Sequence, residues 1–123
     1  MTNSIEFSEL VGETLLSITV SDEGLFFKTN NGRKFEMYHD FNCCEDVKIE
    51  SITGDLNDLI GFPVTIAEVA EGETPNDYQF EFEPDSYTWT FYKLATIKGY
   101  VDIRWLGLSN GYYSEKVSFI EII

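Results

Sequence analysis

The chain has 123 residues, of which 22 are acidic and 8 are basic, so its formal net charge is −14 at pH 7. This charge repels phosphates and anionic lipids, which argues against direct binding of nucleic acid or of a membrane surface. The sequence has no apolar run long enough to span a membrane and no recognisable secretion signal. We therefore expect one domain over residues 1–123, located in the cytoplasm.

Short strands and tight turns are predicted for the first forty residues. Residues 8–11, followed by Gly12, are typical of one helical turn that ends at a glycine. Residues 15–20 and 25–29 have the composition of β-strands. The segment Asn31-Gly32 then predicts a hairpin, because Asn and Gly tolerate the positive φ angles of a type I′ turn.

The only histidine and both cysteines lie within six positions, directly after or at the end of the next predicted strand, residues 34–39. Alternation in this strand places His39 on the same inward face as Phe35 and Met37. Imidazole and thiolate are preferred zinc ligands, and a carboxylate can complete the tetrahedral shell. We predict one structural Zn²⁺ site, with the candidate ligands His39, Cys43, Cys44, Asp40, Glu45 and Asp46.

Other interpretations of this cluster stay open. His39 can be a half-buried residue that is hydrogen-bonded to backbone, beside two buried thiols. Cys43 and Cys44 can form a vicinal disulfide, although such a bond is strained and is less expected in the cytosol. An open fourth zinc position would hold water, which makes a metal-dependent hydrolase one alternative function.

A strand ending near Ile52 leads away from the cluster, and residues 55–61 repeat the pattern of a short helical turn that ends at a glycine. Residues 10–15 read Leu-Val-Gly-x-x-Leu, and residues 59–64 read Leu-Ile-Gly-x-x-Val. The similarity suggests a weak internal repeat of a helix-strand unit.

Residues 49–92 contain no Lys or Arg, and most of their acidic residues fall in or near a predicted loop at about residues 70–85. One interpretation is a negatively charged ridge that docks a cationic partner protein. The alternative is a solvated, mobile insertion, because acidic runs usually face water. The candidate partner-binding residues of this ridge are Glu68, Glu71, Glu73, Asp77, Glu81, Glu83 and Asp85.

A further hairpin is predicted from residues 86–94 and 100–106, joined at Lys98-Gly99. In its first strand we assign Tyr87, Trp89 and Phe91 to the core. In its second strand Val101, Ile103 and Trp105 share one face, opposite Tyr100, Asp102 and Arg104.

Residues 109–111 predict a third tight turn before a last strand at residues 117–122. Tyr112 and Tyr113 follow this turn and are candidate anchors for a protein interface, because each supplies area and a hydroxyl at a low entropy cost. The alternative is that one of them caps the core.

Three hairpin signals and repeated alternation predict a mainly β protein. The expected architecture is an antiparallel sheet, or a small sandwich or barrel, of about seven or eight strands with one or two short helices. An α+β fold is the minor alternative. Neither a nucleophile elbow nor a phosphate-binding loop is present, so we do not expect an enzyme.

Several motifs resemble a small uncharacterised family carried by bacteriophages and prophages, over roughly residues 10–119. They are Tyr-His-x₃-Cys-Cys-Glu-x-Val at 38–47, Gly-Asp-Leu-x-Asp-Leu-Ile-Gly-x-Pro at 54–63, Trp-Thr-Phe-Tyr-Lys at 89–93, Thr-x-Lys-Gly at 96–99 and Arg-Trp-x-Gly-x-Ser-Asn-Gly-Tyr-Tyr-Ser at 104–114. The resemblance implies a setting in the cytoplasm of an infected bacterium and no known catalytic activity.

Small acidic phage proteins are often similar to inhibitors of host defence, including anti-CRISPR proteins. Together with the charge, this similarity leads us to expect a non-catalytic inhibitor that binds a basic host protein, for example an RNA-guided CRISPR nuclease. A protein that sequesters a small molecule, in a pocket lined by Tyr, Trp and Arg104, is the second expectation.

Overall fold

The computed structural model describes residues 2–123, which form nine strands and two 3₁₀ helices. The strands are β1 (Thr2–Ser4), β2 (Leu15–Ser21), β3 (Gly24–Thr29), β4 (Lys34–Tyr38), β5 (Asp46–Thr53), β6 (Ile66–Gly72), β7 (Ser86–Thr96), β8 (Gly99–Ser109) and β9 (Ser118–Ile122). The helices are η1 (Phe7–Leu10) and η2 (Leu56–Leu59). All strand pairs are antiparallel, in two sheets with the orders β1-β9-β4-β3-β2 and β5-β8-β7-β6.

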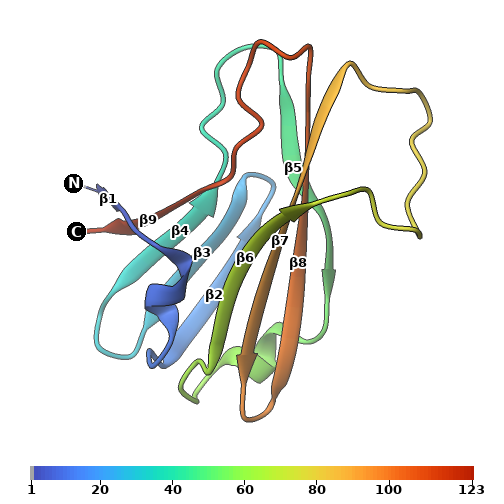
Figure 1. The fold of residues 1–123 in the computed structure, drawn as a ribbon. Coiled ribbons are helices and arrows are strands. Elements are labelled where there is room, and N and C mark those ends of the chain that lie inside the picture. The colour runs from blue at the N-terminus through green and yellow to red at the C-terminus, as the bar shows by residue number, and fades with distance from the viewer. Residues whose placement is uncertain (1) are drawn as a thin grey trace.

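The two sheets face one another as a sandwich (Figure 1). Phe27, Phe35 and Met37 of the first sheet pack against the second sheet, which contributes Ile103 and Trp105. The indole N–H of Trp105 donates to the Met37 sulfur at 3.2 Å, across the interface. The prediction of a mainly β fold is confirmed, and the strands at residues 34–39 and 100–106 bury the predicted faces.

The predicted face of β7 is wrong. Tyr92 and Leu94 point into the sandwich core, whereas Trp89 and Phe91 lie on the outer face of the sheet. Trp89 is nevertheless fully buried, because residues 73–85 cover it from outside. Lys93 shares the outer face and is a sequence signal that favours the observed orientation.

The third predicted turn does not form a hairpin. Gly111 has a positive φ of 92°, as a tight turn requires. However, β9 does not return beside β8: it pairs with β4 and β1 in the other sheet. The segment between β8 and β9 therefore crosses from one sheet to the other, close to the end of β4 (Figure 1).

Both predicted helical turns are present as 3₁₀ helices. Asp55 caps η2 by accepting a hydrogen bond from the Asn57 amide at 2.9 Å. In residues 2–123, neither helix is long and apolar enough to cross a membrane.

Candidate functional site

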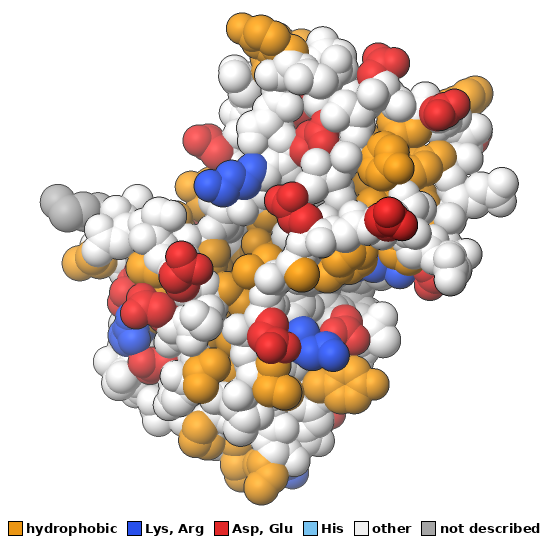
Figure 2. Space-filling model, in the orientation of Figure 1, with side chains coloured by type: hydrophobic (Ala, Val, Ile, Leu, Met, Phe, Trp, Pro, Cys, Tyr) orange, Lys and Arg blue, Asp and Glu red, His pale blue; other side chains and the backbone are white. Residues whose placement is uncertain are grey.

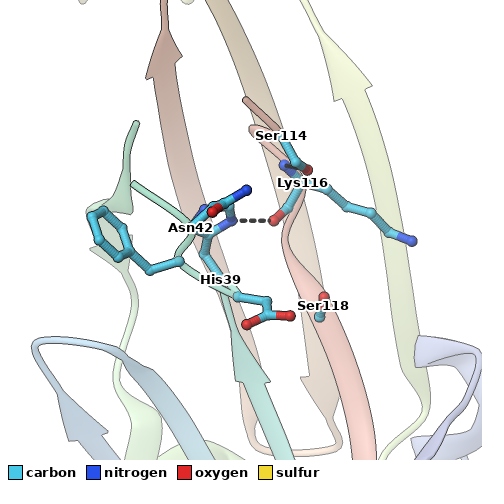
Figure 3. A pocket seen from close by; sticks show the side chains of 7 residues that line it. His39, Asn42, Ser114, Lys116 and Ser118 are labelled. Carbon is cyan, nitrogen blue, oxygen red and sulfur yellow. Dashed lines mark hydrogen bonds between the residues drawn. The ribbon is translucent and has the colours of Figure 1, made fainter. Parts of the chain in front are cut away.

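His39 lies one residue beyond β4, with its side chain only 5% exposed. Its Nδ1 is 2.7 Å from the carbonyl oxygen of Lys116, in the segment that leads into β9 (Figure 3). Its Nε2 is 2.8 Å from Glu45 Oε2. The histidine thus ties the loop after β4 to the crossover segment before β9.

Glu45 is the centre of this loop. Its side chain is fully buried, and its carboxylate accepts hydrogen bonds from the amides of Asn42 at 2.8 Å and Cys43 at 3.0 Å. Burial opposes the charge of Glu45. The bonds from the Cys43 amide and the His39 ring outweigh burial and lower the pKa of Glu45 to about 2.

Both ring nitrogens of His39 face oxygen acceptors. A carbonyl oxygen cannot donate, and an ionised Glu45 carboxylate cannot donate either. His39 and Glu45 therefore form a buried hydrogen-bonded pair, with a second contact from the ring to the Lys116 carbonyl. These contacts hold the loop after β4 against the segment before β9, and hydrogen bonds within the protein already use the polar atoms of the pair.

Of the six predicted zinc ligands, the structure pairs His39 with Glu45 and Cys43 with Cys44, but it does not direct three side chains to one point. Cys43 and Cys44 are joined in a disulfide, so neither presents a free thiolate. Asp40 is exposed, and Asp46 forms an exposed ion pair with Lys48 at 3.4 Å. Within residues 2–123, no group of three His, Cys, Asp or Glu side chains is placed to hold a metal ion. The vicinal disulfide and a hydrogen-bonded histidine are the alternatives that the structure contains.

A polar cavity of about 520 Å³ lies beside His39, lined also by Asn42, Ser114, Lys116 and Ser118. Figure 3 shows these side chains around the opening, with the Lys116 ammonium directed away from the histidine. The ring nitrogens of His39 are not available in this cavity, because the protein itself binds both.

The predicted acidic ridge lies on residues 68–85, from β6 through the loop that follows it. All its predicted partner-binding carboxylates are exposed: Glu68, Glu71, Glu73, Asp77, Glu81, Glu83 and Asp85. We call these seven residues the acidic face. In Figure 2, acidic side chains surround hydrophobic ones in the region of this loop, at the upper right.

Aromatic contacts fasten the loop of the acidic face onto the outer face of the second sheet. The Tyr78 ring meets the Trp89 ring edge-on, with centroids 4.8 Å apart. Phe80 lies 5.1 Å from both the Tyr78 and Tyr87 rings. The Trp89 indole also donates to the Thr74 hydroxyl at 3.0 Å. These contacts favour an ordered surface over a mobile insertion.

Arg104 of β8 adds a polar clamp to the same loop. Its Nε is 2.6 Å from Glu50 of β5, and its Nη1 is 3.0 Å from Asp77 of the loop. The guanidinium carbon lies 5.4 Å from the centroid of the Trp89 ring. A cavity of about 360 Å³ is lined by Arg104, Tyr92 and Phe91, but the ion pairs already engage the guanidinium of Arg104.

Tyr112 and Tyr113 do not cap the core. Tyr112 is 83% exposed, and its ring packs edge-on against that of Tyr113 at 5.0 Å. Tyr113 and Glu71 line one cavity of about 290 Å³, so the tyrosine pair borders the acidic face.

Sequence reasoning missed Phe82, which is 79% exposed between Glu81 and Glu83. An aromatic residue inside an acidic run was the available signal. It also missed Glu115, whose carboxylate accepts hydrogen bonds from Thr88 at 2.7 Å and from Ser109. No local pattern marks Glu115, because Thr88 is distant in the sequence and Ser109 lies on the other side of a turn.

A family model described as a domain of unknown function (DUF7448) matches residues 8–119. Comparisons with curated proteins and with solved structures each found no match. The matched stretch runs from η1 into β9 and includes the His39–Glu45 pair, the acidic face and the tyrosine pair. The chain therefore belongs to the DUF7448 family.

Proposed function

We propose that this protein is a non-catalytic binding protein that docks its acidic face onto a basic protein of the host cell. The observation that carries the proposal is the ordered presentation of that face. Tyr78 and Phe80 pack the loop onto the sheet, and Arg104 clamps it through Asp77. A charged surface held in one conformation loses less entropy on binding than a mobile one.

Charge complementarity supports a basic partner protein. The formal net charge of −14 repels nucleic acid, and the seven exposed carboxylates of the acidic face all fall within residues 68–85. Proteins that handle nucleic acid commonly carry basic surfaces. The resemblance to phage proteins points further, to a host-defence protein such as an RNA-guided CRISPR nuclease that this protein would inhibit by occupying a nucleic-acid groove.

Short-range contacts would come from exposed aromatic residues. Phe82 projects from the acidic face itself, and Tyr112 and Tyr113 border it. Exposed charge mainly raises the association rate, whereas a buried aromatic anchor slows dissociation. Phe82 supplies the apolar centre, and the surrounding carboxylates form a polar rim.

The test is affinity capture from a host lysate followed by reconstitution with the purified captured protein. The variant Glu81→Lys, Glu83→Lys, Asp85→Lys reverses charges that form no ion pair within residues 2–123. The matched control is Glu9→Lys, Asp22→Lys, Glu23→Lys. It changes the net charge equally at exposed acids outside the acidic face.

We expect a stoichiometric complex with wild type and with the control, weakened about tenfold or more by the acidic-face reversal and by moderate salt. Phe82→Ala should accelerate dissociation. If both triple variants behave alike, or if no partner forms a stoichiometric complex, docking through the acidic face is wrong.

A further inference from the structure

A cleft opens between the two sheets where the segment joining β1 to η1 faces β6. Its volume is about 360 Å³. Its apolar wall comes from both sheets and from η1, and includes Phe7, Val69, Val117 and Phe119. Figure 2 shows hydrophobic side chains at the bottom of a hollow near the middle of the molecule, with charged side chains around it.

Two hydroxyl-bearing residues of β7 line this cleft. Thr90 is 5% exposed and Tyr92 is 4% exposed, and both side chains lie on the inner face of their sheet. Neither hydroxyl has a hydrogen-bond partner among residues 2–123. No side-chain N or O atom that is shut off from solvent lacks a partner within residues 2–123, so both hydroxyl oxygens reach solvent in the cleft. The cleft therefore presents two hydroxyls that make no hydrogen bond to the protein.

Charged residues stand at the rim. Glu6, Glu71 and Lys116 line the same cleft, and none of them forms an ion pair within residues 2–123. Burial of the Tyr92 hydroxyl, and then the nearby Glu71 carboxylate, raise the pKa of Tyr92, so this hydroxyl stays neutral at physiological pH.

We propose that this cleft binds a small organic cation, a primary ammonium group on a compact apolar body. An ammonium group has three donors. The Glu71 carboxylate and the hydroxyl oxygens of Thr90 and Tyr92 are three acceptors that line one cleft. The apolar body would pack against Phe7 and Phe119, whose rings meet edge-on at 5.1 Å.

The charged residues at the rim and the net charge of the whole molecule both favour a positively charged ligand. Carboxylates outnumber ammonium groups at the rim, and the formal net charge of −14 favours cations over anions. Lys116 is the one cation lining the cleft within the described chain. It competes with a bound ammonium group, so its removal should strengthen binding.

The experiment is an NMR titration of the full chain with 2-phenylethylamine, compared with the anionic isostere 3-phenylpropionate. Tyr92→Phe and Thr90→Val remove the hydroxyls with little change in shape. Because these hydroxyls have no partner, neither substitution should unfold the protein. Tyr100→Phe is the matched control, since Tyr100 is 61% exposed and lies outside the cleft.

With the amine, we expect saturable shifts of the amide signals of residues 69–71 and 90–92. Glu71→Gln should weaken binding about tenfold, and Tyr92→Phe by severalfold. Lys116→Gln should strengthen it, whereas Glu23→Gln, at an exposed turn, should have no effect. The inference is overturned if the amine does not bind at millimolar concentration, if the anion binds more tightly, or if cleft variants and controls bind equally.

Discussion

Gly12 and Gly61 hold equivalent places in a reciprocal pair of hydrogen bonds. The Gly12 amide donates to the Val64 carbonyl at 2.8 Å, and the Gly61 amide donates to the Leu15 carbonyl at 3.0 Å. These four residues are the corresponding positions of the two similar segments, 10–15 and 59–64. The weak internal match thus identifies two segments that bind each other and join the sheets beside η1 and η2.

Both glycines have positive φ angles, 91° for Gly12 and 87° for Gly61, and open space where a Cβ would lie. Gly12→Ala and Gly61→Ala should therefore each lower the free energy of unfolding by about 1–2 kcal/mol through backbone strain alone. Urea denaturation measures this loss. Asn tolerates this conformation better, so Gly12→Asn should lose less. Equal losses for Ala and Asn would contradict the strain argument.

Tyr78 should control the order of the acidic face. Tyr78→Ala removes two edge-on ring contacts, with Trp89 and Phe80, each contributing about 1 kcal/mol. We expect an endoproteinase specific for Glu to cleave residues 73–85 about tenfold faster or more. The midpoint of global unfolding should change little, because Tyr78 lies outside the sandwich core.

Tyr78→Phe is the control for that prediction, since it keeps the ring. Its cleavage rate should match wild type. If Tyr78→Ala also leaves the rate unchanged, the aromatic contacts do not order the loop.

Glu45 should make the fold sensitive to acid. Its folded pKa of about 2 lies below the ordinary glutamate value of about 4.3, so the ionised form is favoured by folding. The resulting stabilisation is present above about pH 4.3 and is lost as the pH falls toward 2. The free energy of unfolding, measured by urea titration across this window, should decrease with falling pH. Glu45→Gln should flatten that slope, and an unchanged slope would show that Glu45 is not the group responsible.

The cysteine pair should be unreactive before reduction. Because Cys43 and Cys44 are bonded to each other, alkylation of the native protein should modify neither thiol, and alkylation after reduction should modify both. Intact mass spectrometry distinguishes these states. Two reactive thiols without reduction, together with zinc in metal analysis, would restore the zinc site expected from the sequence.

The positions of the strands along the chain depend on neighbouring residues, and the alternation of apolar and polar residues predicted most of these positions. Phe35 and Met37 alternate with polar residues, and Gly32 permits the turn before them, so β4 and its hairpin follow from neighbouring residues. The predicted type I′ turn is wrong, because Gly32 has a positive φ and Asn31 does not. β7 shows the limit of this reasoning. Aromatic residues occupy both of its faces, and only the covering loop and Lys93 distinguish outside from inside.

The sequence determined part of the candidate site, namely the residues that share one loop. The spacing of His39 and Glu45 placed both in one loop, which is why they meet. The partners that decide their chemistry are distant: the Lys116 carbonyl approaches only because β9 crosses to the first sheet and pairs with β4. The cleft beside Thr90 and Tyr92 likewise exists only between packed sheets. Residue pattern determines which face of a strand is apolar, whereas the choice of sheet and the contacts across it depend on long-range packing that no local pattern encodes.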